Sequence, residues 1–506
     1  MKAYAKFCLL VVVLACGLTV FVDGAPIPPD HELRQHFPSL SNNDFAEMTN
    51  LLDQIKQVAH DRFYGKDSVA VAQHSTDMRP SVSISIAQPG VQVPISRYLF
   101  EGDILLSPLQ ANVILRNLLR VLRKNRRRRS SWPALKQLIT SSSMLLSRDK
   151  RSLYSSEKAR WKNFPIQYTF HDSLSVDAVT EIGLAIDYWM NHTCLTFEKV
   201  SEPERDYIEF FRGQGCYSMI GRVGGRQGVS IGDGCERTGT IEHEIGHALG
   251  LWHEQARPDA DCCIVLEPDN IINNFISDFL QRSWEEVLTY GIPYDMGSVM
   301  HYGSTAFTND WSKKTVLTRD ARYQRTIGQR ERLSFYDVQV INKAYCPKHC
   351  DIDLPCFNGG YTHPGKCDGC ICPDGFGGIV CDRHEQPKNA QCGGMLPALE
   401  QWAEITSPGY PHPGYNIDQK CSWILRAPQG KRVELEFIDR FQFFCTTTCL
   451  DFVEVKASAD VKLTGFRYCC FERPTEAVVS ELADMIVIFR STVSRDVGFK
   501  ARFRYS

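Results

Sequence analysis

Apolar and polar residues follow two regular patterns in different parts of the chain. Apolar residues recur at helical spacing over residues 43–63, 112–122 and 176–190, which predicts amphipathic helices. Between residues 392 and 506 they alternate with polar residues in short stretches bounded by Pro and Gly, which predicts a β-sandwich. Further short strands are expected at residues 165–170, 207–211 and 228–231. The chain is therefore predicted to combine a mixed α/β region with an all-β region that follows it.

The first residues predict export from the cell. Residues 1–6 contain two lysines, and residues 7–20 form a nearly unbroken apolar run that ends near small residues. This arrangement indicates a secretory signal peptide over residues 1–24. A membrane anchor is less favoured, because the run is shorter than the ~20 residues that a helix needs to cross a bilayer. We therefore expect a secreted, extracellular protein without a membrane span.

Length, charge and cysteine content narrow the class further. A chain of 506 residues with 43% hydrophobic content can form three or more domains, and a net charge of -2 gives no reason to expect nucleic acid as a partner. Of its 20 cysteines, 18 follow the expected signal peptide, in groups of six over residues 194–346, 350–381 and 392–470. An even count in a secreted chain indicates disulfides. The middle group has too few apolar residues for a core, so crosslinks must stabilise it, and the alternative of a zinc knuckle is less favoured in an oxidising compartment.

The segment before the cysteine groups is interpreted as a propeptide. Residues 25–151 contain no cysteine and end in two basic clusters, at residues 123–129 and 148–151. A run of charge is usually a solvated segment. In a secreted chain, however, the sequence Arg-Asp-Lys-Arg that ends at Arg151 looks like a processing site for a furin-like convertase. Cleavage after Arg151 is expected, and cleavage after Arg129 is the alternative.

One short stretch carries candidate metal chemistry. His243 and His247 are four residues apart, so on a helix both imidazoles lie on one face and can bind a single zinc ion, with Glu244 beside them. A glycine three residues later can turn the chain and bring His253 back as a third ligand. Such a histidine pair also occurs by chance on solvated helices. Met300, in the sequence Ser-Val-Met-His-Tyr, supplies the methionine turn that the extended pattern requires, so we predict a zinc hydrolase.

These motifs closely resemble the astacin family of zinc endopeptidases. The matching stretches are His-Glu-x2-His-x2-Gly-x2-His-Glu-x2-Arg-Pro-Asp, from His243 to Asp259, and Tyr-Asp-x2-Ser-Val-Met-His-Tyr, from Tyr294 to Tyr302. Residues 350–381 resemble an EGF-like module, and residues 392–506 resemble a CUB domain. This order is similar to that of nematode astacin-like proteases and of the tolloid and procollagen C-proteinase group.

The resemblance implies a fold class and a division of the chain. The expected fold is an α/β (α+β) protease domain of the metzincin type, with a twisted sheet and an active-site helix, followed by a small disulfide-rich module and a β-sandwich. The expected divisions are a signal peptide at 1–24, a propeptide at 25–151, an astacin-like peptidase domain at 152–347, an EGF-like module at 348–382 and a CUB domain at 392–506.

The resemblance also assigns roles to individual residues. It implies that one zinc ion is bound by His243, His247 and His253. Glu244 matches the general base, Tyr302 the tyrosine that stabilises the oxyanion, and Met300 the apolar floor under the metal. Phe100-Glu101-Gly102-Asp103 matches the family's latency motif, in which the aspartate takes the place of the catalytic water. Without the resemblance, this stretch would be an ordinary acidic turn.

Several covalent features follow from the same resemblance. The implied disulfides are Cys194–Cys346, Cys216–Cys235, Cys350–Cys367, Cys356–Cys370, Cys372–Cys381 and Cys392–Cys421. The loop lengths of the EGF-like part depart from the usual spacing. The partners of six cysteines stay open, with a strained vicinal bond as one option for the first two: Cys262, Cys263, Cys445, Cys449, Cys469 and Cys470. Asn191 begins an Asn-x-Thr sequon and is a candidate glycosylation site.

Substrate choice is less clearly indicated. Either Arg330 or Arg332 is a candidate pocket residue that favours an acidic residue after the scissile bond, and a plain surface arginine is nearly as well supported. An edge strand is expected near residues 227–231, where an extended peptide can bind by strand addition. The expected partners are an extracellular protein substrate, with collagen precursors of matrix or cuticle as candidates, and the convertase. The rival hypotheses are an inactive adhesion protein that keeps the protease fold and a zinc esterase.

Overall fold

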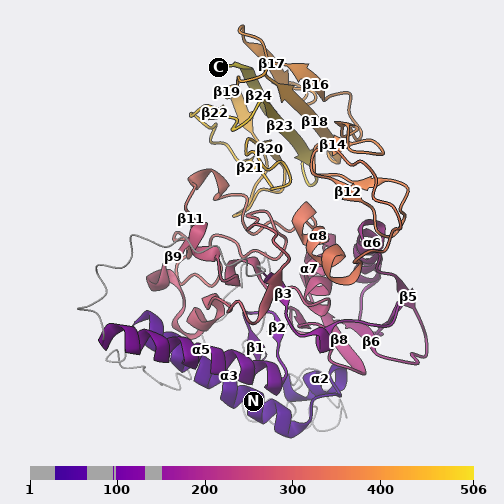
Figure 1. Ribbon diagram of the computed structural model, residues 1–506, viewed down its shortest axis with the longest axis vertical. Coiled ribbons are helices and arrows are strands. Elements are labelled where there is room, and N and C mark those ends of the chain that lie inside the picture. The colour runs from indigo at the N-terminus through magenta and orange to yellow at the C-terminus, as the bar shows by residue number, and fades with distance from the viewer. Residues whose placement is uncertain (1–28, 65–94, 96–97, 131–150) are drawn as a thin grey trace, which may run out of the picture.

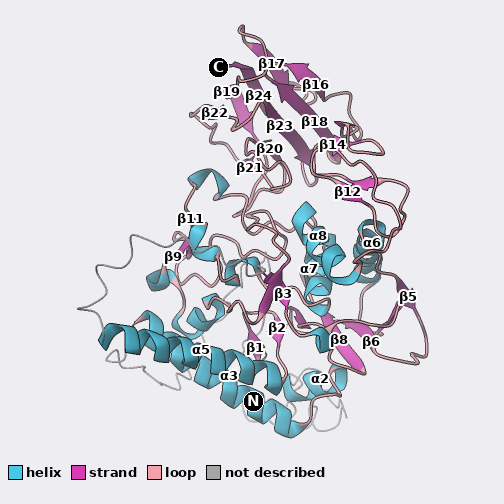
Figure 2. Ribbon diagram, viewed as in Figure 1, coloured by secondary structure: helices cyan, strands magenta, loops and turns pink. Residues whose placement is uncertain are grey.

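A computed structural model of the chain describes residues 29–64, 95, 98–130 and 151–506. Figure 1 shows three tiers along the long axis. They are the helices of residues 29–130, which we call the pro-segment after the predicted propeptide, then the mixed α/β region, then the disulfide-rich module with the β-sandwich. Helices predominate at the first end and strands at the other (Figure 2). Within the described residues every helix is too short or too polar to cross a membrane. The expected signal peptide and the basic residues 148–150 lie outside them.

Three helices of the pro-segment cover one side of the mixed α/β region. Helix α3 (Asn42–Phe63) begins at a capping box, in which the side chain of Ser41 accepts from the amide of Asp44 and the side chain of Asp44 accepts from the amide of Ser41. Its apolar face is buried, as the periodic spacing of its apolar residues predicts. Helices α2 (Pro29–His36) and α5 (Pro108–Ser130) accompany it, and α5 packs directly on α3.

A seven-stranded mixed sheet joins the pro-segment to the peptidase region, in the order β1-β2-β7-β8-β6-β4-β5. Its strands are β1 (Leu99–Phe100), β2 (Ile104–Leu105), β4 (Ile166–Phe170), β5 (Phe197–Lys199), β6 (Tyr207–Phe211), β7 (Cys216–Met219) and β8 (Arg226–Ile231). Strands β1 and β2 form an antiparallel hairpin, and β2 pairs with β7 in parallel. The pro-segment therefore supplies the two outermost strands at one edge of the sheet.

The peptidase strands of the sheet end at β7, next to the pro-segment strands, and at β5 on the opposite side, so the expectation of an edge near residues 227–231 is wrong. Those residues belong to β8, which lies between β7 and β6 and is almost wholly buried. The chain folds back after β6, so the short strand β7 pairs antiparallel with β8 and covers its free side. Four residues of β7 are too few to show an alternating pattern, which explains why the sequence did not reveal it.

Helices α6 (Val176–His192) and α7 (Thr238–Ala248) pack against each other in the core of the peptidase region. Helix α6 begins where the side chain of Ser175 accepts a hydrogen bond from the backbone of Ala178. Helix α8 (Phe335–Tyr345) begins at a capping box formed by Ser334 and Asp337. The remaining elements of this region are β3 (Arg151–Tyr154), η1 (Glu157–Ala159), η2 (Glu254–Ala256), η3 (Ala260–Cys262), β9 (Ile264–Leu266), η4 (Pro268–Asn270), η5 (Asn273–Phe279), β10 (Val287–Thr289), β11 (Val316–Thr318) and η6 (Ala321–Tyr323).

The C-terminal part consists of two modules that share apolar contacts. The disulfide-rich module contains the short strands β12 (Tyr361–Thr362), β13 (Cys370–Ile371), β14 (Phe376–Gly377) and β15 (Arg383–His384). Its Phe376 packs with Ile486 and Ile488 of the sandwich. The sandwich has a five-stranded sheet of β16 (Gly394–Pro397), β18 (Gln419–Arg426), β23 (Asp484–Ser491), β20 (Phe452–Lys456) and β21 (Phe466–Tyr468), and a four-stranded sheet of β17 (Ala403–Thr406), β24 (Gly498–Tyr505), β19 (Val433–Gln442) and β22 (Val478–Val479). The predicted succession of α+β region, crosslinked module and sandwich is confirmed.

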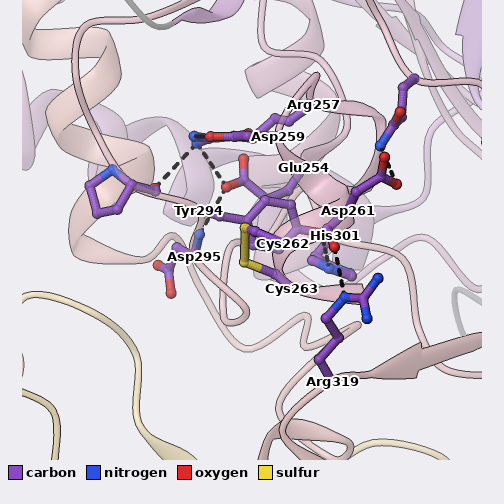
Figure 3. The surroundings of a disulfide bond; sticks show 12 residues. Glu254, Arg257, Asp259, Asp261, Cys262, Cys263, Tyr294, Asp295, His301 and Arg319 are labelled. Atoms are coloured by element: carbon purple, nitrogen blue, oxygen red, sulfur yellow. Dashed lines mark hydrogen bonds and ion pairs between the residues drawn. A yellow bond between two sulfur atoms is a disulfide. The ribbon is translucent and has the colours of Figure 1, made fainter. Parts of the chain in front are cut away.

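Each disulfide of the described structure lies within one module. The bonds include the six expected pairs: Cys194–Cys346, Cys216–Cys235, Cys350–Cys367, Cys356–Cys370, Cys372–Cys381 and Cys392–Cys421. The pairs that the sequence left open are Cys445–Cys470, Cys449–Cys469 and the vicinal bond Cys262–Cys263. Figure 3 shows the vicinal bond next to Asp261, whose backbone carbonyl oxygen accepts a hydrogen bond from Nε of Arg319 at 2.7 Å. The modules are therefore joined to one another by the backbone and by noncovalent contacts.

Candidate active site

Helix α7 and the turn after it bring three histidines together. His243 and His247 lie one helical turn apart, with their Nε2 atoms 3.0 Å from each other. Gly250 has a φ of +104°, a conformation that suits glycine, and it turns the chain so that His253 returns to the same point. All three imidazoles are fully buried. The predicted convergence of these histidines is therefore present.

Hydrogen bonds to the Nδ1 atoms fix the tautomers of His243 and His247. Nδ1 of His243 lies 2.9 Å from the carbonyl oxygen of Val299, and Nδ1 of His247 lies 2.8 Å from that of Leu251. A carbonyl oxygen only accepts, so Nδ1 carries the proton and Nε2 presents a lone pair toward the centre. Burial lowers the pKa of both His243 and His247, which keeps these rings neutral, as metal ligands must be.

The donor set fits a zinc ion. One oxygen of Asp103 and one nitrogen from each histidine all lie within 4.8 Å of one another. Tetrahedral zinc with bonds of about 2.0 Å holds its nitrogen ligands about 3.3 Å apart, close to the observed 3.0 Å between two Nε2 atoms. Two lone pairs at that distance repel unless a cation lies between them. The site also contains buried oxygens without a hydrogen-bond partner among the described residues, on Asp103 and Glu244.

Glu244 lies next to this centre and is fully buried. Neither of its carboxylate oxygens has a hydrogen-bond partner in the part of the chain that the structure describes. Burial raises the pKa of Glu244 well above its usual value, and the nearby carboxylate of Asp103 acts in the same direction. A carboxyl group with these properties is suited to take up a proton.

The turn of the pro-segment hairpin fills the space in front of the histidines. Oδ2 of Asp103 lies 3.2 Å from Nε2 of His243 and 3.2 Å from Nε2 of His253. Gly102 has a φ of +81°, and a Cβ atom there would lie 2.5 Å from the ring of Phe307, so only glycine fits. Burial alone would raise the pKa of Asp103, but the imidazoles, with His253 first among them, hold it well below its usual value. The aspartate is therefore a buried anion at the centre of the site.

Comparisons with known proteins agree with this geometry. The family model of the astacin peptidases matches residues 153–346, and the CUB domain model matches residues 392–503. Zinc metalloproteinase nas-36 of Caenorhabditis elegans is 50% identical over 476 residues, which are 93% of this chain and 72% of that protein. The chain belongs to the astacin family. Zinc metalloproteinase dpy-31 of Teladorsagia circumcincta is 36% identical over 494 residues, 95% of this chain and 76% of that protein. High choriolytic enzyme 1, a hatching enzyme zinc-protease of Oryzias latipes, is 32% identical over 39% of this chain and 98% of its own, with a TM-score of 0.36.

As a member of this family, the protein is a zinc metalloendopeptidase with one catalytic zinc ion. The three histidines of α7 and its following turn are the residues of this astacin that would hold the ion. The rival hypothesis of an inactive scaffold has no support in the site, because each expected ligand and Glu244 are in place.

The methionine turn of this astacin lies under helix α7. Met300 is buried, and its sulfur lies 3.1 Å from the position that a Cβ atom on Gly246 would take. Asp337 of α8 fixes the turn, since its two oxygens accept from the hydroxyl of Ser298 at 2.6 Å and from the amide of Val299 at 2.8 Å. No pattern in the sequence connects Asp337 with the site, because the residue lies in a separate helix.

Tyr302 points its hydroxyl at the pro-segment. It donates a hydrogen bond to the backbone carbonyl oxygen of Glu101, and its own amide donates to the side chain of Gln255 at 3.0 Å. Burial raises the pKa of Tyr302 well above its usual value, so the hydroxyl stays protonated. With the pro-segment in place, this tyrosine thus bonds a peptide carbonyl beside the three histidines.

Glu101 is a site residue that the sequence analysis did not single out. Its Oε2 lies 2.8 Å from Nδ1 of His253, and its Oε1 lies 3.4 Å from Nε of Arg282. Burial acts to lower the pKa of His253, but the carboxylates of Asp103 and Glu101 raise it to about 9. Arg282 also lies over the ring of Phe100, at 4.6 Å. The sequence offered one indication of this role, because Glu101 is an acidic residue inside the latency motif. Its partner Arg282 lies in a stretch without regular secondary structure, so no periodic pattern could have identified it.

The two arginines proposed for the substrate pocket have different surroundings. Arg330 donates from Nη1 to the carbonyl oxygens of His301, at 3.0 Å, and Gln329, at 2.8 Å, while its buried Nε has no partner among the described residues. Burial lowers the pKa of Arg330 to about 10, although the carboxylates of Asp103 and Glu244 act in the opposite direction. Arg332 instead pairs with Asp374 of the disulfide-rich module. Of the two, Arg330 therefore belongs to the histidine site and Arg332 does not.

Three further positions named from the sequence lie away from the histidines. Asn191 is exposed near the C-terminal end of α6. Arg151 is the first residue of β3, opposite Thr289 of β10. Arg129 lies inside helix α5.

Proposed function

We propose that this astacin is secreted as a latent precursor, is activated by removal of its propeptide, and cleaves extracellular proteins. Collagen precursors of matrix or cuticle are the candidate substrates. The observation that carries the proposal is the hairpin turn of the pro-segment, which places Asp103 against the histidines of an otherwise complete peptidase site. The corresponding divisions are a signal peptide at 1–24, a propeptide at 25–151, a peptidase domain at 152–347, an EGF-like module at 348–382 and a CUB domain at 392–506.

The chemistry divides between the metal and the side chains. Zinc bound by His243, His247 and His253 supplies Lewis acidity, which polarises the peptide carbonyl and lowers the pKa of water. Glu244 accepts the proton of the attacking water and passes it to the leaving amine. Tyr302, which bonds the carbonyl of Glu101 in the precursor, would donate the same hydrogen bond to the oxyanion of a substrate.

Strand β7 provides a surface for the substrate backbone. In the precursor, Ile104 and Leu105 pair with Ser218 and Met219. Departure of the pro-segment exposes this edge, and an extended peptide can then add to the sheet through its main chain. Such binding is independent of side chains, which suits an endopeptidase that acts within a long chain.

Two features support activation by a convertase at Arg151. Leu153 is buried, and the amide of Tyr154 donates to the carbonyl oxygen of Gly250 at 2.8 Å, so the chain just after Arg151 already belongs to the peptidase domain. The alternative, Arg129, lies within helix α5, whereas proteases cleave extended segments. The nine disulfides among the described residues support maturation in an oxidising, secretory compartment.

The test of the activity is the substitution Glu244→Gln in protein cleaved at Arg151. We expect the rate of peptide hydrolysis to fall by about 10²–10⁴-fold, because the general base is lost, while the zinc content stays at one ion per chain. The matched control is Glu198→Gln, at an exposed position of β5. Full activity of the Glu244→Gln variant would sink the assignment.

The substrate preference is tested with a peptide library and the same cleaved protein. Arg330 lies beside the site, and its buried Nε has no partner among the described residues, so it is suited to pair with an acidic residue after the scissile bond. We expect Asp or Glu to be enriched there in the wild type and not in an Arg330→Ala variant. A preference for apolar residues at that position would oppose the procollagen-like interpretation.

A further inference from the structure

We propose that two arginines of the CUB module, Arg467 and Arg490, are positioning residues for Arg330 of the peptidase site. They act on residues 326–333, which we call the substrate loop. The inference rests on the proposed role of Arg330 in substrate choice, and it makes the CUB module part of the specificity apparatus of the enzyme.

The direct contact is made through Glu331, the residue that follows Arg330. One oxygen of its carboxylate pairs with Nη1 of Arg490, and the other lies 3.3 Å from Nη1 of Arg467. The side chains of Arg467, Arg490 and Glu331 are only 5%, 7% and 15% exposed, respectively. Ion pairs at this depth are little screened by solvent, unlike pairs at a protein surface.

The charges of this junction are balanced across three modules. Nε of Arg467 donates to Oε2 of Glu454 at 3.0 Å, within the CUB module. Asp374 of the disulfide-rich module pairs with Arg332 and lies 3.4 Å from Nη2 of Arg490. Three guanidinium groups thus face three carboxylates, so loss of any one member leaves an uncompensated buried charge.

Backbone contacts hold the start of the substrate loop on the same module. The hydroxyl of Thr326 donates to the carbonyl oxygen of Gly465 at 3.1 Å and accepts from the amide of Arg467 at 3.0 Å. Close by, Asp295 accepts from both the amide and the hydroxyl of Thr464, each at 3.2 Å. The loop is therefore attached to the CUB module at its first residue as well as at Glu331.

The opposite side of the loop rests on the catalytic helix α7. A Cβ atom on Gly239 would collide with the carbonyl oxygen of Arg330, so helix and loop touch backbone to backbone. The amide of Leu333 donates to the buried carboxylate of Glu242 at 2.8 Å. Glu242 immediately precedes His243, so the loop lies between the metal-binding helix and the arginines of the CUB module.

The placement of Arg330 depends on this backbone. Its guanidinium is oriented by two main-chain carbonyls, one of them within the loop itself. A shift of the loop therefore moves its Nε relative to the histidines. The contacts named for this junction all lie within residues 151–506, outside the pro-segment, so they persist after activation.

The first test is hydrogen–deuterium exchange of the full-length precursor, with Arg490→Gln, Arg467→Gln and a matched control. The control is Arg502→Gln, an arginine of the other CUB sheet that pairs with Glu436. We expect the amides of residues 326–334 to exchange at least about tenfold faster in the first two variants and unchanged in the control. Arg490→Lys keeps the charge but offers one nitrogen for the two carboxylates that Arg490 contacts, so it should restore only part of the protection. Unchanged exchange in the Arg490→Gln and Arg467→Gln variants, or equal acceleration in the control, overturns the proposal.

A second variant covers the case in which the CUB substitutions prevent folding. Glu331→Gln removes the carboxylate from the peptidase side and leaves the CUB module intact. The same acceleration over residues 326–334 is expected, and its absence counts against the proposal.

The kinetic test uses activated enzyme and two peptides that differ only in Asp or Ala after the scissile bond. We expect Arg490→Gln to raise KM for the Asp peptide at least fivefold, with kcat, zinc content and the Ala peptide little changed. A lower melting temperature with an unchanged ratio of the two peptides would show a purely structural role. If Arg330→Ala itself leaves the ratio unchanged, the proposed role of Arg330 fails, and the exchange experiment decides whether the CUB module holds the loop.

Discussion

Two of the buried, charged contacts that the described peptidase domain makes with other parts of the chain differ in what they engage. The pro-segment directs Asp103 and Glu101 at the imidazoles of His243 and His253. The CUB module directs Arg467 and Arg490 at Glu331, which is neither a zinc ligand nor the base. A contact that occupies the reacting groups has to be removed before catalysis. A contact that engages only the residues supporting them can remain. Under the functions proposed above, burial of charge would serve inhibition in the first case and alignment in the second.

The largest expected effect comes from Asp103→Ala, in a precursor that also carries Arg151→Ala and cannot be cleaved there. Loss of one member of a buried charge set should raise peptide hydrolysis by the intact precursor on the order of 100-fold. The assay is hydrolysis of a fluorogenic peptide. The control is Asp53→Ala, at an exposed position of α3. If the uncleaved Asp103→Ala precursor does not hydrolyse the peptide, the assignment of latency to Asp103 is contradicted.

The substitution Gly102→Ala tests the same contact by shape instead of charge. A Cβ atom there lies 2.5 Å from Phe307, and φ is +81°, so the turn has to shift. We expect a cost of about 1–3 kcal/mol, seen as a rise on the order of tenfold in the activity of the uncleaved precursor. Equal activity of this variant and its parent would show that the turn adapts without leaving the histidines.

Gly297→Ala applies a comparable clash to the CUB contact. A Cβ atom on Gly297 would collide with Cγ2 of Thr464. The expected cost is again about 1–3 kcal/mol, measured as a lower melting temperature of the full chain. In contrast to the preceding variant, the uncleaved precursor should remain inactive. Peptide hydrolysis by uncleaved Gly297→Ala protein would contradict the claim that only the pro-segment contact keeps the precursor inactive.

A pH dependence is expected for the pro-segment contact at Glu209 of β6. Burial acts to raise the pKa of Glu209, but His36 of α2, the nearby Arg226 and His171 together lower it below its usual 4.5. The docking contribution of this carboxylate is therefore complete above pH 4.5 and is lost as pH falls below that value. Limited proteolysis of α2 should therefore accelerate a few-fold as the pH falls from about 4.5 to about 3. Glu209→Gln should make the proteolysis rate of α2 less dependent on pH. An identical pH profile in the variant and the wild type would refute the role of Glu209.

The smallest effect is expected at the surface pair of Arg120 and Glu285, where pro-segment and peptidase domain also meet. Their side chains are 60% and 68% exposed, so solvent screens the pair. Arg120→Ala should change the melting temperature of the precursor by no more than corresponds to about 0.5 kcal/mol. A large loss of latency here would mean that surface charge, and not the buried turn, holds the pro-segment.

The sequence predicted the parts of the site that local spacing determines. His243 and His247 follow from helical periodicity and His253 from the glycine turn. Asp103 was assigned only through the resemblance to the astacin family, because its own stretch reads as an ordinary acidic turn. Contacts between distant segments left no such trace. Three contacts depend on the tertiary fold: Glu101 pairs with Arg282, Asp337 accepts hydrogen bonds from the methionine turn, and Arg332 pairs with Asp374.

The same distinction explains the misplaced edge strand. Periodicity identified residues 228–231 as a strand, but the neighbours of a strand are set by chain connections and not by its own pattern. The short β7 carried no pattern of its own, so the fold-back that covers β8 could only be seen in three dimensions. The CUB sandwich was easier to predict, because its longest strand, β19, alternates in burial over most of its ten residues.

Confinement of every observed disulfide to a single module has a consequence for the timing of activity. Residues 25–151 contain no cysteine, so after one cut at Arg151 no disulfide retains the inhibitor. An intramolecular ligand at a high effective concentration then becomes a separate molecule, whose occupancy obeys mass action. Release of the enzyme into a large extracellular volume would complete activation by dilution, whereas a confined space would sustain inhibition by the severed fragment.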